Sequence, residues 1–233
     1  MRTDYQRRRD AKEHKAWLFC RSLKENDLYA LLENNDSVIR YAAARRLQTP
    51  GSDATVAHAK NLCHHKNYRT REIGCFILGQ IKNADCNIPD LMAFLDACAA
   101  SDTAAIVRAA AIIAMGHMCL KHDAEISLWP ILAKRCTLAA NSPFVSVRVA
   151  VAFALINPGD GSMLPVLIKL LRDKNGEVRS WAGCAINGNG YDTPELHLIF
   201  SQMLMDEHGG ARYEAEKWFA EHPNVQQGAI SRL

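Results

Sequence analysis

The chain has 233 residues, of which 48% are hydrophobic and 23% charged, and this composition excludes an intrinsically disordered protein. Its net charge of +3 comes entirely from residues 1–15, which carry six basic and three acidic side chains, so the remainder of the chain is neutral. A neutral body excludes a surface that follows nucleic acid along its whole length by charge. The eight cysteines contain no C-x-x-C pair, and no segment has the length and apolar character of a signal peptide or a membrane span. We therefore expect a cytoplasmic protein with free thiols and no membrane partner.

Residues 1–24 are predicted to form a basic capping helix. The segment YQRRRDAKEHKAWLF has the spacing of an amphipathic helix, in which Trp17, Leu18 and Leu23 would cover the open end of the first repeat. Stacked-helix proteins need such caps because a terminal repeat otherwise exposes its apolar face. The same basic run is also compatible with a nucleic-acid or localisation patch, and we favour the cap.

Residues 25–233 carry six copies of one pattern, each centred on an arginine. Successive arginines are 31, 37, 40, 31 and 33 residues apart, at Arg40, Arg71, Arg108, Arg148, Arg179 and Arg212. In every copy the residues one before, three after and seven after the arginine are apolar or small. Positions about four residues apart lie on one face of a helix, so this face is predicted to enter the core.

A second apolar segment precedes each arginine-containing segment. These segments lie at residues 27–32, 55–63, 89–98, 126–139, 163–171 and 195–205. Ser142-Pro143 and Thr193-Pro194 each predict a helix N-cap followed by a first-turn proline. Each repeat is thus predicted to be two antiparallel helices. One pair cannot bury its apolar face alone, so we expect about six pairs to stack as an all-α solenoid.

The residue six before each arginine is polar in all six copies and falls where the chain should turn. These residues are Asn34, His65, Asp102, Ser142, Asp173 and Asp206. An arginine that recurs once per repeat commonly donates to turn carbonyls or to acids of the neighbouring repeat. We therefore predict that the six arginines are structural, and we regard a ladder of anion-binding sites as the lesser alternative.

The repeat pattern resembles the HEAT family, in particular its short V-R-x-x-A subtype, over residues 25–221. The segments KNYRTREIGCFILGQI (66–81) and DKNGEVRSWAGCAIN (173–187), with YQRRRDAKEHK (5–15), resemble the enterobacterial YibA-type HEAT-repeat proteins. That family is associated with Rhs toxin loci and assigned an immunity role. The resemblance implies a non-enzymatic HEAT-repeat α-solenoid, monomeric when free, that neutralises the toxin domain of an Rhs-type effector in the bacterial cytoplasm.

The second helix of each predicted pair has a face opposite its core face, at positions one, five and nine after the arginine. In this fold these helices usually line the concave surface. The face carries aromatic anchors with few, mixed charges, which is typical of a protein-binding groove. The predicted partner-binding residues are Tyr41, Arg45, Glu72, Phe76, Ile113, His117, Val149, Phe153, Trp181, Tyr213 and Lys217. The alternative is that curvature buries these residues against one another.

Two other functions are compatible with the same fold. A HEAT-fold DNA-binding or repair enzyme of the alkylpurine glycosylase type would use aromatic side chains such as Trp129, Trp181 and Trp218, but the neutral body lacks the charge that such an enzyme needs. A general protein-interaction scaffold is the other alternative. HEAT-repeat hydroxylases bind iron through His-Glu dipeptides, and the chain has none in that order.

Two groups of histidine and cysteine are candidate metal sites: His58 with residues 63–65, and His117 with Cys119 and His122. His58 and residue 63 are poorly placed on one helical face, and a fourth ligand is not clear. No thiol has a base and an orienting group defined around it, and the cysteines on the repeat helices, at 75 and 184, are interpreted as packing residues. We expect no metal, no cofactor, no catalytic residue and no nucleic-acid partner.

Overall fold

The computed structural model describes residues 4–49, 51–82, 86–122, 127–156 and 161–222, which form thirteen helices and no strand. The N-terminal helix α1 spans Asp4–Arg21. Six pairs follow: α2 (Glu25–Leu31) with α3 (Ser37–Gln48), α4 (Asp53–Leu62) with α5 (Tyr68–Gly79), α6 (Ile88–Ser101) with α7 (Ala105–His122), α8 (Trp129–Ala139) with α9 (Val145–Ala154), α10 (Leu164–Leu171) with α11 (Gly176–Asn189), and α12 (Pro194–Met203) with α13 (Gly209–Glu221). The predicted helix pairs are therefore confirmed. In the part of the chain that the structure describes, no helix combines the length and hydropathy needed to cross a membrane.

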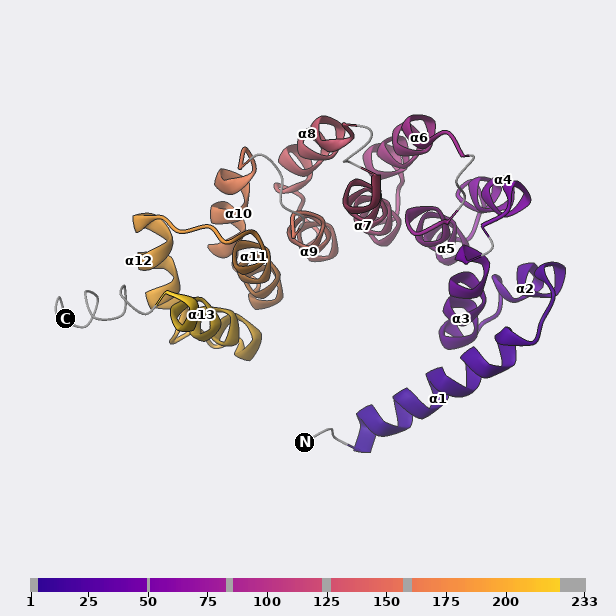
Figure 1. Cartoon of the computed structure of the whole chain (residues 1–233), viewed down its shortest axis with the longest axis horizontal. Coiled ribbons are helices and arrows are strands. Elements are labelled where there is room, and N and C mark those ends of the chain that lie inside the picture. Colours follow the sequence, from indigo (N-terminus) through magenta and orange to yellow (C-terminus); the bar gives the residue numbers. More distant parts are fainter. Residues whose placement is uncertain (1–3, 50, 83–85, 123–126, 157–160, 223–233) are drawn as a thin grey trace. The chain divides into compact units, whose positions relative to one another are not determined.

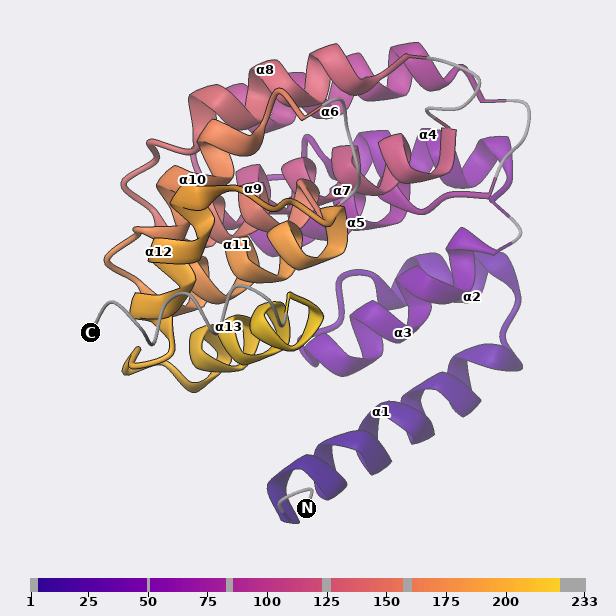
Figure 2. The same cartoon turned by 60° about the vertical axis from the view of Figure 1, so that its left-hand side comes forward.

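The chain divides into two compact units, residues 1–114 and 115–233, and the division falls within α7. In the first unit, α2, α4 and α6 form a first layer and α3 and α5 a second layer, with α1 packed along α3 (Figures 1 and 2). In the second unit, α8, α10 and α12 form the first layer, and α9, α11 and α13 form the second (Figure 1). Each unit is a stack of helix pairs, as expected for an α-solenoid.

The core of each unit consists of the face predicted from the repeat. The position three after the arginine is buried in every copy, at Ala43, Gly74, Ala111, Val151, Ala182 and Ala215. The position seven after it is also buried in every copy, at Leu47, Leu78, Met115, Leu155, Ile186 and Phe219. Small side chains at the first of these positions let neighbouring helices approach closely. A Cβ atom on Gly74 would lie 2.7 Å from the carbonyl oxygen of Ala59 in α4.

Polar side chains begin most of the second-layer helices. Asp36, Asn67 and Asn175 each accept a hydrogen bond from the backbone N–H two residues later, and thereby satisfy a donor that the helix itself leaves free. Thr193 caps α12 with Pro194 in its first turn, as predicted. The prediction for Ser142-Pro143 is wrong, because α9 begins at Val145 with Phe144 as its N-cap residue. Ser142 lies in the preceding turn, where its hydroxyl accepts from the backbone N–H of Phe144.

The N-terminal helix packs on the first repeat through a different set of side chains from the predicted one. Among residues 6–21 of α1, whose side chains the structure describes, Ala16 and Cys20 are the buried ones, at 8% and 1% exposure, whereas Trp17 and Leu18 are 45% and 47% exposed. Leu23 lies after the helix and is half-buried. Four-residue spacing puts Ala16 and Cys20 on one face, and their small size allows α1 to lie close to α3.

Candidate functional site

The six repeat arginines share one contact. The Nη1 atom of each donates to the backbone carbonyl of the residue six positions earlier, at distances of 2.5 to 3.0 Å. This bond ties the start of each second-layer helix to the turn before it and satisfies a backbone carbonyl of that turn. The guanidinium groups are therefore engaged by the protein, as the sequence predicts for structural arginines.

Three of the arginines also pair with the aspartate of the following repeat. Nε and Nη2 of Arg148 donate to the two carboxylate oxygens of Asp173 at 2.6 and 2.9 Å. The equivalent two-bond pairs join Arg71 to Asp102 and Arg179 to Asp206. Two parallel hydrogen bonds to a carboxylate fix both distance and orientation. Each pair therefore sets the register between two consecutive repeats.

Each of these aspartates has a second role in its own turn. Burial by itself raises the pKa of Asp173, but hydrogen bonds from Arg148 and from the backbone N–H of Asn175 outweigh it, and the net pKa is lowered. The pKa values of Asp102 and Asp206 are lowered by the equivalent bonds. All three carboxylates are thus held in the ionised form. Arg40 lacks such an aspartate because His65 occupies that position, and its buried Nε atom has no hydrogen-bond partner among the described residues.

In the second unit, the predicted binding residues form an aromatic row, defined as His117, Phe153 and Trp181. The ring centroids of His117 and Phe153 are 5.4 Å apart, and those of Phe153 and Trp181 are 5.2 Å apart, both in edge-to-face geometry. The three side chains come from α7, α9 and α11 and are all half-buried, as is Val149. Burial lowers the pKa of His117, so its imidazole is neutral at neutral pH.

The remaining predicted residues of the second unit lie outside the aromatic row. Tyr213 is 61% exposed, and Lys217 is also exposed, both on α13. The predicted residues of the second unit therefore include half-buried aromatic side chains on α7, α9 and α11 and exposed polar side chains on α13.

In the first unit, two of the predicted residues, Glu72 and Phe76, contact a third, Tyr41. Its ring packs edge-to-face on Phe76 with a centroid separation of 4.9 Å, and its hydroxyl donates to Glu72 at 2.5 Å. Burial, followed by the hydrogen bond to Glu72, raises the pKa of Tyr41. Arg45 is exposed and Ile113 is half-buried. Each unit thus brings three of the predicted side chains into contact, Tyr41 with Phe76 and Glu72 in the first and Phe153 with His117 and Trp181 in the second, and all six remain partly accessible.

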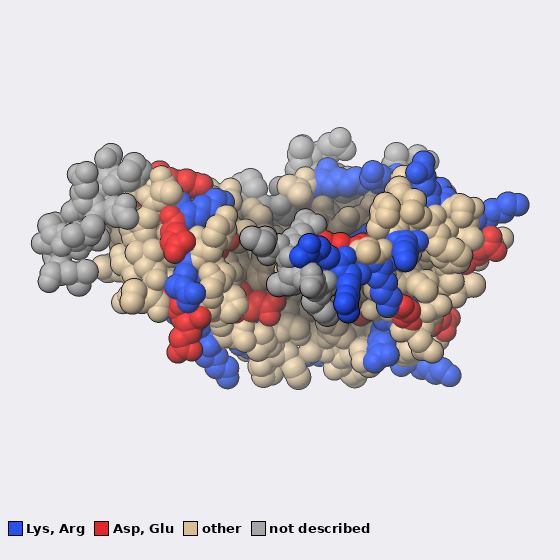
Figure 3. Space-filling view, turned by 90° about the horizontal axis from the view of Figure 1, so that it is seen from below, with Lys and Arg blue, Asp and Glu red and all other residues tan. Residues whose placement is uncertain are grey.

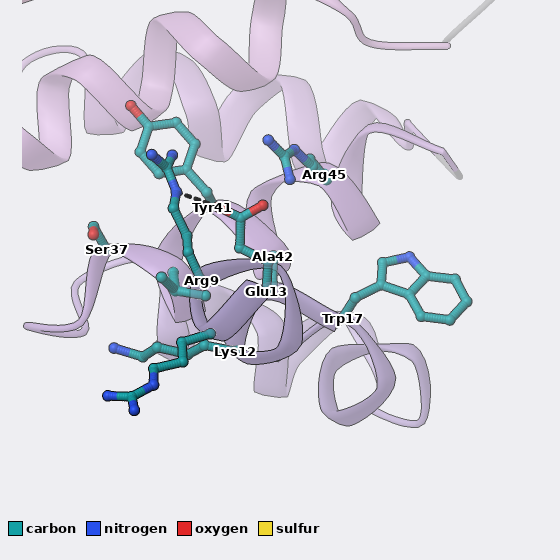
Figure 4. A pocket seen from close by; sticks show the side chains of 10 residues that line it. Arg9, Lys12, Glu13, Trp17, Ser37, Tyr41, Ala42 and Arg45 are labelled. Carbon is teal, nitrogen blue, oxygen red and sulfur yellow. Dashed lines mark hydrogen bonds and ion pairs between the residues drawn. The ribbon is translucent and has the colours of Figure 1, made fainter. Parts of the chain in front are cut away.

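A groove lies between α1 and α3 in the first unit, next to the predicted binding residues Tyr41 and Arg45. The sequence pattern does not predict this groove. Its volume is about 760 Å³, and its lining includes Tyr41 and Arg45 from α3 and Arg8, Arg9 and Lys12 from α1. Figure 4 shows Arg9 extending toward Tyr41, with its ion pair to Glu13 marked. The space-filling view shows basic side chains gathered on this side of the first unit (Figure 3). Docking of the capping helix thus adds positive charge next to the predicted binding residues.

Sequence reasoning also missed a cluster of three cysteines in the first unit. The sulfur atoms of Cys63, Cys75 and Cys98 all lie within 4.8 Å of one another. These residues are 12 and 23 positions apart on different helices, so spacing along the chain gives no sign of their proximity. Neither of the two candidate groups of histidine and cysteine forms a three-residue cluster among the described side chains, and the side chain of His122 lies outside the described part.

The comparisons with known proteins agree with this architecture. A family model described as HEAT repeats matches residues 25–116. Protein YibA of Escherichia coli K12 is 37% identical over 215 residues, which cover 92% of this chain and 76% of that protein, and YibA of E. coli O157:H7 matches to the same extent. The X-ray structure of E. coli YibA has a TM-score of 0.83 at 33% identity, over 94% of this chain and 78% of that one. An engineered protein at 18% identity, with a TM-score of 0.54 over 88% of this chain and 97% of that one, shows the fold alone. The chain therefore belongs to the family of HEAT-repeat proteins that includes YibA.

Proposed function

We propose that this chain is a non-enzymatic protein that binds another protein through its second-layer helices. The observation that carries the proposal is the aromatic row of His117, Phe153 and Trp181, whose half-buried rings form a preassembled surface. Partly buried aromatic side chains are the residues that most often dominate binding energy at protein interfaces. His117 is the row's titratable group, and its lowered pKa and its packing on Phe153 favour a neutral contact residue over an acid–base catalyst.

The preferred partner is the toxin domain of an Rhs-type polymorphic toxin effector. This identification rests on the resemblance to the YibA-type proteins, and the surface is compatible with it. The groove beside α1 is basic, with Arg8, Arg9 and Lys12, and the chain as a whole has a net charge of +3. An inhibitor of a strongly basic nuclease is usually acidic, since opposite potentials steer the encounter. The charge of this chain therefore favours a toxin domain that is not strongly basic.

The test is co-purification from the native host, with the full chain as bait and moderate salt in the wash. We expect one polypeptide in stoichiometric amount, encoded next to this chain and toxic when it is produced alone. Phe153→Asp should lose that polypeptide. Leu198→Asp is the matched control, because Leu198 is also an accessible apolar residue of the second unit, 69% exposed, but lies on the first-layer helix α12. Recovery of no such polypeptide, together with salt-sensitive retention of DNA, would overturn the proposal in favour of a DNA-binding enzyme.

A further inference from the structure

Three thiols from three helices converge in the first unit. Cys63 is the C-cap residue of α4, Cys75 lies in α5 and Cys98 lies in α6. The Sγ atoms of Cys63 and Cys75 are 3.8 Å apart, and all three sulfurs lie within 4.8 Å of one another. Cys63 and Cys75 are buried, whereas Cys98 is half-buried and gives the cluster an open side.

The position of Cys63 depends on the absence of a side chain at Gly74. A Cβ atom on Gly74 would lie 2.6 Å from the Sγ atom of Cys63, closer than real atoms approach. Gly74 occupies the repeat position that is alanine or valine in the other five copies. This glycine therefore opens the space that Cys63 uses to reach Cys75, the residue that follows Gly74 in α5.

The spacing of the sulfurs matches that of a thiolate metal site. Zinc binds cysteine sulfur at about 2.3 Å in tetrahedral geometry, which places two sulfur ligands about 3.8 Å apart. Cys63 and Cys75 already have this separation. The third sulfur, within 4.8 Å of both, needs to move by about 1 Å or less to complete the same triangle.

Cys98 is the member of the cluster that solvent reaches, so an ion would enter from its side. The neighbouring thiols and burial raise the pKa values of Cys63 and Cys75, so an ion would have to displace their protons as it binds.

We propose that Cys63, Cys75 and Cys98 together bind one thiolate-preferring d10 metal ion, of which Zn²⁺ is the reference. The three sulfurs donate to the ion, and the thiol protons leave to water as it enters. A solvent molecule takes the fourth position on the open side. The ion would cross-link α4, α5 and α6, and this role is independent of partner binding by the aromatic row.

The experiment titrates the full-length, reduced and metal-free chain with Cd²⁺, which reports sulfur ligands by thiolate-to-metal charge-transfer absorption, and measures Zn²⁺ affinity by competition with a chelator. We expect one ion per chain. Cys98→Ser should weaken binding by more than about a hundredfold, since even loss of an outer-shell partner costs 10- to 100-fold. Cys20→Ser and Cys136→Ser, which remove buried thiols outside the cluster, should bind as the wild type does.

A second measurement separates metal binding from folding. Without metal, Cys98→Ser should melt close to the wild type, because this side chain is half-buried and serine is nearly isosteric. Zn²⁺ should raise the melting temperature of the wild type and leave that of Cys98→Ser unchanged. Equal Zn²⁺ affinity in the wild type and Cys98→Ser, or absence of the sulfur charge-transfer band in the wild type, would overturn the proposal and leave the three thiols as packing residues.

Discussion

Arg148 and Asp173 form the most buried of the three inter-repeat ion pairs, with their side chains 7% and 10% exposed and Nε of the arginine 2.6 Å from Oδ2 of the aspartate. Nη1 of the same arginine donates to the carbonyl of Ser142. One guanidinium therefore joins the turn before α9 to the turn before α11. A contact of this kind fixes the position of one repeat relative to the next.

We expect Arg148→Ala to lower the free energy of unfolding by about 3–5 kcal/mol, because it leaves the carboxylate of Asp173 buried without its partner. Arg172→Ala is the control, since Arg172 pairs with Glu195 at the surface, where both side chains are about half exposed. That substitution should cost less than about 1 kcal/mol. Urea denaturation followed by circular dichroism measures both, and equal losses in the two variants would contradict a structural role for the repeat arginine.

The aspartates make stability dependent on pH in a defined direction. The folded pKa values of Asp102, Asp173 and Asp206 are lowered below their ordinary value, so their stabilisation is fully present above that value, near pH 4, and is lost as pH falls through the folded pKa values. Asp173→Asn removes one of these groups. The variant should be less stable than the wild type at pH 7, and the difference between them should shrink toward pH 3. Melting temperatures across this range test the prediction, and a difference that grows on acidification would contradict it.

Gly74→Ala should destabilise the first unit. The added Cβ would lie 2.6 Å from the Sγ atom of Cys63 and 2.7 Å from the carbonyl oxygen of Ala59, so α4 and α5 would have to separate. Overpacking of this kind costs about 1–3 kcal/mol. Gly188→Ala is the matched control, because its Cβ would meet Ile156 at an ordinary 3.6 Å and alanine is the better helix former. Thermal melting should show a loss for the first variant and no loss for the second.

Two substitutions on α1 test how the capping helix is attached. Ala16→Asp should release α1 from α3, because it places a charge in a contact that is 8% exposed. Leu18→Asp should change stability by less than about 0.5 kcal/mol, because that side chain is 47% exposed. Limited proteolysis measures release as faster cleavage within residues 1–24. Equal protection of the two variants would show that Ala16 does not anchor the helix.

The repeat architecture could be predicted from the sequence because its signal is local. A core position recurs about every four residues around each arginine, and six copies reinforce one another. The prediction failed at the start of α9. The hydroxyl of Ser142 accepts a hydrogen bond from the backbone N–H of Phe144 within the turn, so Ser142 does not cap α9, which begins three residues later at Val145.

Rotation of a helix about its own axis was harder to predict. Residues 16–20 of α1 are all apolar, so periodicity there did not distinguish the buried Ala16 and Cys20 from the exposed Trp17 and Leu18. The cysteine cluster was missed for a similar reason. Its three members lie on separate helices, and their convergence depends on interhelical distances that Gly74 sets and that sequence spacing does not encode.

The proposed binding of a toxin domain by the aromatic row is tested most directly with point variants, together with the partner polypeptide that co-purification is expected to recover. The measurement is growth of cells that produce this domain together with the wild type, Phe153→Asp or Leu198→Asp, with melting temperatures to show that each variant folds. Phe153 contacts both His117 and Trp181, so a charge there should cost about 2 kcal/mol or more of binding, or at least about thirtyfold in affinity. We predict that the wild type and Leu198→Asp protect the cells and that Phe153→Asp does not. Equal protection by all three folded proteins would contradict binding through this row, and no protection by the wild type would contradict the immunity role.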